Sequence, residues 1–75
     1  MSAAGSTMGR RVASQRVLVG MSQEELAKAV GVTGPYLSKI ENDHRSDGLT
    51  LKTLRGIAEA TGASLDWLVY GKGER

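Results

Sequence analysis

The sequence predicts an all-α fold, a compact bundle of five short helices in a single domain. Apolar residues recur at spacings of three and four in several short segments. A serine or threonine precedes most of these segments, and a glycine ends most of them, as helix boundaries require. The chain has 75 residues and no cysteine. A core this small, without disulfides, must be stabilised by helix packing or by a partner chain.

The first helix is predicted over residues 9–19, where Val12, Arg16 and Val19 share one face. Gly20 follows as a helix stop. Residues 1–8 are expected to be a disordered leader or a cloning remnant. The folded domain is then expected to span residues 9–71, with a frayed tail at 72–75.

The second helix is predicted to begin after Ser22, which forms a capping box with Glu25. Three residues of this helix are expected to face inward: Leu26, Ala27 and Val30. Gly31 ends it, with a positive φ that other residues resist.

The third helix is predicted to follow Thr33, a good N-cap. Pro35 is tolerated in its first turn, where amides lack intrahelical partners. Leu37 and Ile40 point to the core, and residues 42–48 form a loop. Two short helices across a tight turn make a helix-turn-helix, whose second helix, here about residues 34–42, enters the major groove of DNA.

A fourth helix is predicted after Thr50, with four apolar residues on its buried stripe: Leu51, Leu54, Ile57 and Ala58. Gly62 ends it. Ser64 caps a short fifth helix that runs through Tyr70.

Composition excludes several classes of function. The net charge of +2 is only mildly basic, although three arginines, Arg10, Arg11 and Arg16, precede the first acidic residue, Glu24. His44 stands alone and there is no cysteine, so we expect no metal site and no cofactor. No nucleophile–base pair or phosphate-binding glycine loop is present, so we expect no enzyme. No apolar run approaches the roughly 20 residues that span a bilayer, and no secretory signal is present, which favours a cytoplasmic protein without a membrane partner.

The segment SQEELAKAVGV followed by YLSKIEN resembles the DNA-binding domain of lambdoid phage repressors and Cro proteins, the XRE-type helix-turn-helix family. The resemblance covers roughly residues 9–71, since IAEATGASLDWL, residues 57–68, is similar to the family's fourth and fifth helices. It implies a lambda-repressor-like fold and sequence-specific binding of double-stranded DNA by a transcriptional regulator, with repression as the expected mode. It also implies a homodimer on a pseudo-palindromic operator, with half-sites about one helical turn apart.

The resemblance implies roles for four polar residues. Gln23 matches a glutamine that binds phosphate and braces the recognition helix, although it could be an ordinary first-turn residue. Asn42 matches a phosphate-contacting residue, or it serves only as a C-terminal cap. Arg16 and Glu41 match an arginine–carboxylate pair, which would explain an arginine on an apolar stripe.

The recognition helix is expected to present Gly34, Pro35, Ser38 and Lys39 to base edges, with Thr33 and Tyr36 flanking them. Well-known members of the family often carry hydrogen-bonding residues where this chain has glycine and proline. Direct readout therefore falls to Ser38, Lys39 and Tyr36. The alternatives are solvated surface positions for Ser38 and Lys39 and a core position for Tyr36.

Five basic residues are candidate phosphate contacts: Arg10, Arg11, Lys28, Arg45 and Lys52. Four residues near the end of the chain are candidate dimer contacts, with core packing as the alternative for the first two: Trp67, Leu68, Val69 and Tyr70. Because Gly34 and Pro35 weaken the usual reading surface, a second function stays open. The same fold could serve as a protein-interaction module, such as an antitoxin or an adaptor.

Overall fold

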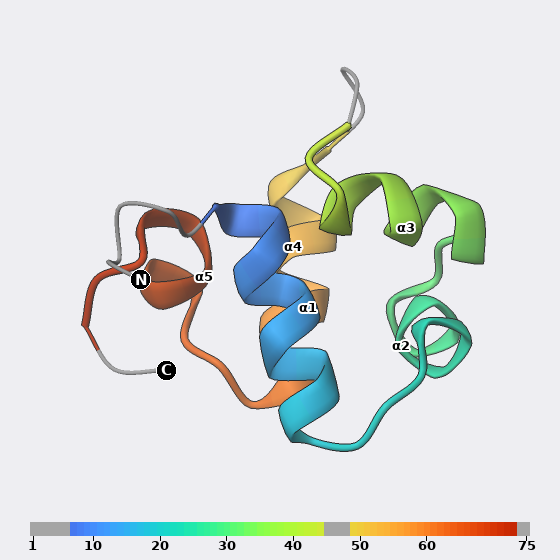
Figure 1. Ribbon diagram of the computed structural model, residues 1–75, viewed down its shortest axis with the longest axis horizontal. Coiled ribbons are helices and arrows are strands. Elements are labelled where there is room, and N and C mark those ends of the chain that lie inside the picture. Colours follow the sequence, from blue (N-terminus) through green and yellow to red (C-terminus); the bar gives the residue numbers. More distant parts are fainter. Residues whose placement is uncertain (1–6, 45–48, 74–75) are drawn as a thin grey trace.

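The computed structural model describes residues 7–44 and 49–73, and all regular structure within these ranges is helical. Five helices follow one another along the chain: α1 Met8–Leu18, α2 Gln23–Val30, α3 Gly34–Glu41, α4 Leu51–Thr61 and α5 Leu65–Tyr70. The predicted all-α, five-helix fold is thereby confirmed. α1 lies at the centre, between α5 on one side and α2 and α3 on the other (Figure 1).

A hydroxyl side chain caps the start of every helix. The capping residues are Thr7, Ser22, Thr33, Thr50 and Ser64, and each accepts from the amide three residues later. These bonds satisfy amides that have no partner within the helix. Because Thr7 is the first of these caps, α1 begins at Met8, one residue earlier than predicted.

The core draws on all five helices. Six apolar side chains in it are completely buried: Val12, Leu26, Leu37, Ile40, Ile57 and Leu68. Two residues that the sequence places on apolar helix faces are exposed. Val19 is 44% exposed because it lies beyond the last residue of α1, as its C-cap. Leu51 is 61% exposed because it is the first residue of α4, at the rim of a groove between α2 and α4.

Candidate nucleic-acid interface

The turn between α2 and α3 sets the angle at which the two helices meet. Gly31 takes the left-handed conformation at φ 88°, and its amide donates to the carbonyl of Ala27 at 2.9 Å. The amide of Val32 donates to the same carbonyl at 3.0 Å. Thr33 then caps α3, whose buried residues include Leu37 and Ile40. α3 therefore packs on the core along one face and leaves the opposite face outside.

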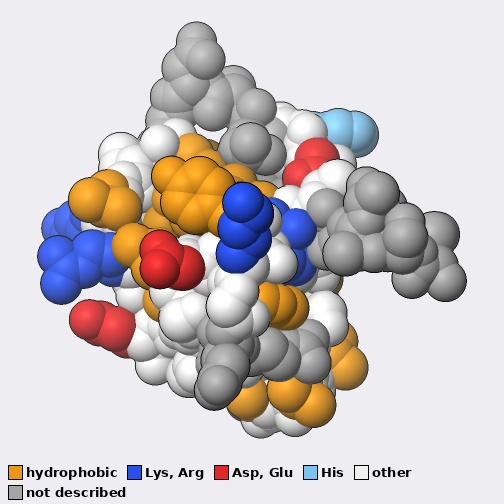
Figure 2. All heavy atoms as spheres, turned by 90° about the vertical axis from the view of Figure 1, so that its left-hand side faces the viewer, with side chains coloured by type: hydrophobic (Ala, Val, Ile, Leu, Met, Phe, Trp, Pro, Cys, Tyr) orange, Lys and Arg blue, Asp and Glu red, His pale blue; other side chains and the backbone are white. Residues whose placement is uncertain are grey.

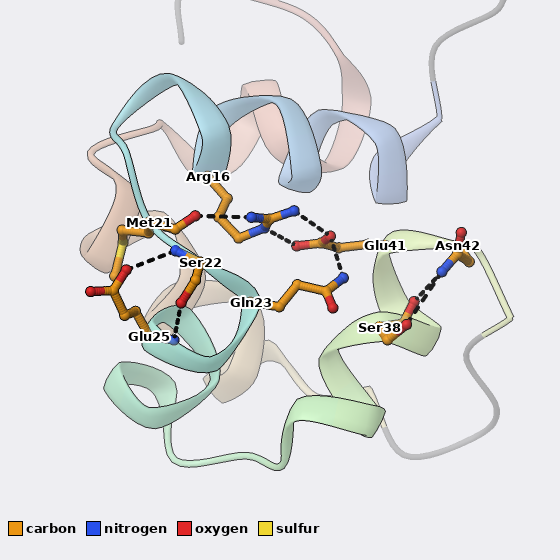
Figure 3. Close-up of polar contacts among 8 residues, drawn as sticks. All are labelled: Arg16, Met21, Ser22, Gln23, Glu25, Ser38, Glu41 and Asn42. Atoms are coloured by element: carbon orange, nitrogen blue, oxygen red, sulfur yellow. Dashed lines mark hydrogen bonds and ion pairs between the residues drawn. The ribbon is translucent and has the colours of Figure 1, made fainter.

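A polar junction ties the end of α3 to α1. Arg16 Nε donates to Glu41 Oε2 at 2.7 Å and Nη2 donates to Oε1 at 3.1 Å, so the guanidinium meets the carboxylate with two parallel bonds (Figure 3). Arg16 Nη1 also donates to the carbonyl of Met21 at 2.9 Å. The Glu41 side chain is only 4% exposed and that of Arg16 16%. The pair therefore lies largely out of solvent, between α1 and α3.

Gln23, the first residue of α2, joins the same junction. Its Nε2 donates to Glu41 Oε1 at 2.8 Å (Figure 3). One carboxylate thus connects α1, α2 and α3. This bond links the first residue of α2 to the last residue of α3.

The outer face of α3 carries most of the predicted reading residues. Thr33, Pro35 and Lys39 are exposed, whereas Gly34 and Ser38 are half-buried. Tyr36 is also half-buried, and its side chain packs against the hydrophobic core, which is the position given by its alternative prediction.

Asn42 is the C-cap of α3, and its side chain folds back on the helix. Nδ2 donates to the carbonyl of Ser38 at 2.8 Å and lies 3.4 Å from the Ser38 hydroxyl (Figure 3). The capping role is therefore the one seen in the structure. A phosphate contact by this amide would have to replace its bonds to Ser38.

Arg11 is a correction to the predicted phosphate contacts. It is only 9% exposed. Its Nε donates to the carbonyl of Leu68 and its Nη2 to that of Val69, both at 3.0 Å. The buried guanidinium joins α1 to α5 through these two carbonyls. It does not point into solvent, where a DNA phosphate would lie.

The other basic candidates have different positions. Arg10, Lys28 and Lys52 are exposed, on α1, α2 and α4 respectively. Arg45 lies outside the described residues. The exposed side chains are therefore the ones that can reach an anionic partner.

The candidate dimer contacts divide in the same way. Leu68 is completely buried and Trp67 packs against the core, whereas Tyr70 is 70% exposed. On the side of the molecule where α5 lies, hydrophobic side chains reach the surface among charged ones (Figure 2). Of the four candidates, Leu68 is thus a core residue, and Tyr70 is the most available to a partner.

Sequence reasoning missed a second junction between α1 and α3, formed by Thr7, Gly9 and Asp43. Asp43 Oδ1 accepts from the Gly9 amide at 3.0 Å, and Oδ2 accepts from the Thr7 hydroxyl at 2.5 Å. A Cβ on Gly9 would lie 2.4 Å from the carbonyl oxygen of Ile40, so the backbones meet closely here. An aspartate in a loop signals tolerance of unusual φ, but it does not reveal a partner 34 residues away.

Two other features of the described part of the chain, residues 7–44 and 49–73, concern membranes and metal ions. Its helices are all too short or too polar to cross a membrane. Nor do its histidine, aspartate and glutamate residues gather in threes that could hold a metal ion.

Comparison with known proteins agrees with this geometry. The family model described as helix-turn-helix matches residues 12–68. The P22 c2 repressor, solved with a synthetic operator, is 27% identical with a TM-score of 0.80, over 89% of this chain and 98% of that one.

Two other solved regulators have the same fold. SinR, a master regulator for biofilm formation solved in complex with DNA, is 29% identical with a TM-score of 0.75, over 83% of this chain and 97% of that one. The restriction-modification controller protein C.AhdI from Aeromonas hydrophila is 28% identical with a TM-score of 0.74, over 81% and 89%. The chain therefore belongs to the helix-turn-helix family, in its XRE-type, phage repressor-like branch.

Proposed function

We propose that α3 reads base edges in the major groove of operator DNA, as the recognition helix of a transcriptional regulator. Sequence-specific binding of double-stranded DNA is the function that the family and its DNA-bound relatives support. The observation that carries the proposal for this chain is the outer face of α3. Pro35 and Lys39 are exposed there, while the Glu41 junction holds the helix from behind. The proposal includes no catalytic step and no cofactor.

The exposed residues of α3 suggest distinct contacts. Lys39 can donate to guanine O6 and N7, and Pro35 can touch a thymine methyl group. Ser38 accepts from Asn42 through its hydroxyl oxygen, so its O–H can still donate to a base. Thr33 and the exposed part of Tyr36 flank this surface, and Gly34 lets a phosphate approach the backbone closely. Base readout therefore depends most on Lys39.

Phosphate contacts are proposed for five polar or basic side chains: Gln23, Asn42, Arg10, Lys28 and Lys52. Gln23 is the most specific of these. Its amide nitrogen carries two hydrogens, and one bond to Glu41 leaves the second available to a phosphate oxygen. The same side chain could thus brace α3 and fix its register on the duplex.

We further propose that two copies bind a pseudo-palindromic operator and repress by occupying it. One recognition helix contacts few base pairs, and a two-fold pair of domains would place two such helices one helical turn apart. Tyr70, exposed on α5, and its neighbour Val69 are the proposed centre of the contact between copies.

Selection of binding sites from random duplexes tests this function. We expect an enriched site with two-fold symmetry, and an affinity that falls steeply with salt as phosphate contacts release counterions. An asymmetric site would contradict the dimer alone. Failure to bind any duplex at low salt would contradict DNA recognition, and it would favour the protein-interaction module, an antitoxin or adaptor.

Lys39→Ala is expected to relax sequence preference at one base pair in each half-site, at a cost of about 1–3 kcal/mol on the selected operator. The reason is that Lys39 would contact a base and not the backbone. Arg10→Ala is the contrasting variant, because it removes a proposed phosphate contact. It should weaken all duplexes about equally and reduce the salt slope by about one. Binding titrations against single-base operator variants measure both effects, and the opposite pattern would place the reading face elsewhere.

A further inference from the structure

Asp43, which directly follows the C-cap of α3, has an unusual backbone. Among the described residues it is the one residue other than glycine with a positive φ, at 59°. This left-handed conformation disfavours side chains with a Cβ, although aspartate tolerates it better than most. Such a conformation persists where the surroundings hold it in place, and it often marks a functional constraint.

The carboxylate of Asp43 holds the start of α1. Its two oxygens accept from the Gly9 amide at 3.0 Å and from the Thr7 hydroxyl at 2.5 Å. The Thr7 hydroxyl in turn accepts from the amide of Arg10 at 3.2 Å. A negative group from the end of α3 thus sits at the positive end of α1, where the helix dipole favours it.

The residues that follow α3 in the chain are held by backbone hydrogen bonds to its last turn. The Asp43 amide donates to the carbonyl of Ile40 at 3.1 Å, and the His44 amide donates to that of Lys39 at 2.8 Å. Asp43 is therefore continuous with the last turn of the recognition helix. The bonds of its carboxylate to α1 therefore also hold α3, the helix that carries Lys39.

α3 is attached to α1 at two places. Glu41 binds Arg16, and Asp43 binds Gly9, seven residues or about two helical turns earlier on α1. One polar attachment fixes α3 to α1 at a single point, whereas two attachments at different points add to the core packing of Leu37 and Ile40 in fixing the direction of the helix. We propose that Asp43 is a positioning residue for DNA recognition, setting the angle at which α3 enters the major groove. This inference rests on the proposed function.

A positioning role of Asp43 and a purely electrostatic role predict opposite changes in DNA affinity. Asp43 is exposed and lies one residue after Asn42, on the side where phosphate contacts are proposed. Removing its negative charge should therefore leave non-specific DNA binding unchanged or make it stronger. A misdirected α3 should instead weaken binding to the selected operator, because base contacts depend on alignment.

The test compares Asp43→Asn and Asp43→Gly with the unmodified chain. Asparagine removes the charge at nearly constant shape, and glycine removes the carboxylate while relieving the backbone. For Asp43→Gly, which loses both bonds, we expect the ratio of operator affinity to non-specific affinity to fall about fivefold or more, the lower end of what one aligned base contact contributes. The ratio should fall less for Asp43→Asn, because its amide oxygen can still accept from the Gly9 amide. Melting temperatures should stay within about 5 °C of the unmodified chain. Glu59→Gln, which neutralises an exposed carboxylate on α4, is the control and should keep the ratio.

An unchanged ratio in Asp43→Gly, with the fold intact, would overturn the inference even if Asp43→Asn were unstable. A ratio that falls equally in Glu59→Gln would also overturn it, because charge alone would then suffice. A selection that enriches no duplex would refute the proposed function itself, and the role of Asp43 would fall with it.

Discussion

Glu41→Ala is expected to destabilise the domain by about 3–5 kcal/mol, the usual cost of removing one member of a buried ion pair. The loss would leave the Arg16 guanidinium with the Met21 carbonyl as its one remaining hydrogen-bond partner at this junction, and it would also release the Gln23 amide. A small domain with a total stability of about 5 kcal/mol would keep only about 0–2 kcal/mol, so at the upper end of the loss about half of the variant would be unfolded at room temperature. Urea unfolding followed by circular dichroism measures the change.

Two further variants separate the junction's components. Gln23→Ala removes one hydrogen bond and should cost only about 0.5–1.5 kcal/mol. The double variant Arg16→Met with Glu41→Leu replaces both charges by apolar groups and should regain much of the stability lost in Glu41→Ala. If Glu41→Ala melted within about two degrees of the unmodified chain, the pair would contribute nothing of this size.

Gly9→Ala is expected to have the second largest effect, a loss of about 3 kcal/mol, at the upper end of overpacking costs. The added Cβ would lie 2.4 Å from the carbonyl oxygen of Ile40 and 2.7 Å from that of Glu41. Both are backbone atoms at the end of α3, so α1 and α3 would have to separate. This cost exceeds the gain of up to about 1 kcal/mol that alanine brings to a helix.

Gly34→Ala is the matched control for this substitution. Gly34 also lies in the first turn of a helix, but apart from its chain neighbours nothing stands within 4 Å of the position of its Cβ. Alanine gains helix propensity there, but a Cβ directly before Pro35 is disfavoured in helical backbone, so we expect the stability to change by no more than about 1 kcal/mol. Equal unfolding midpoints for the two alanine variants would show that the close approach at Gly9 does not constrain the helices.

Local features of the fold could be predicted from the sequence because their causes lie a few residues apart. Ser22 and Glu25 form the expected capping box, and Thr33 caps α3 with Pro35 in its first turn. Gly31 and Gly62 end their helices in the left-handed conformation. The pairing of Arg16 with Glu41 is different, because it came from the family resemblance and not from spacing.

Features that depend on distant parts of the chain could not be predicted. Arg11 was predicted to contact phosphate because nothing near it in the sequence indicates another partner. Its actual partners, the carbonyls of Leu68 and Val69, are 57 and 58 residues away. Gln15 is buried one turn further along α1 and donates to the carbonyl of Thr61 at 2.9 Å, again a distant backbone group. At helix ends, apolar spacing predicts too much burial. It places Leu51 on the buried stripe of α4, although most of this side chain is exposed.

The shared carboxylate of Glu41 has a consequence for protein engineering. The two-helix motif of residues 22–42 contains every residue proposed to read bases, yet it depends on contacts with the rest of the domain. Glu41 forms its ion pair with Arg16, which lies on α1, and α2 packs against α4. An excised peptide, or a graft onto a foreign scaffold, would strand that charge and uncover apolar side chains. To transfer the DNA specificity to another protein, the surrounding helices must therefore be transferred together with the motif.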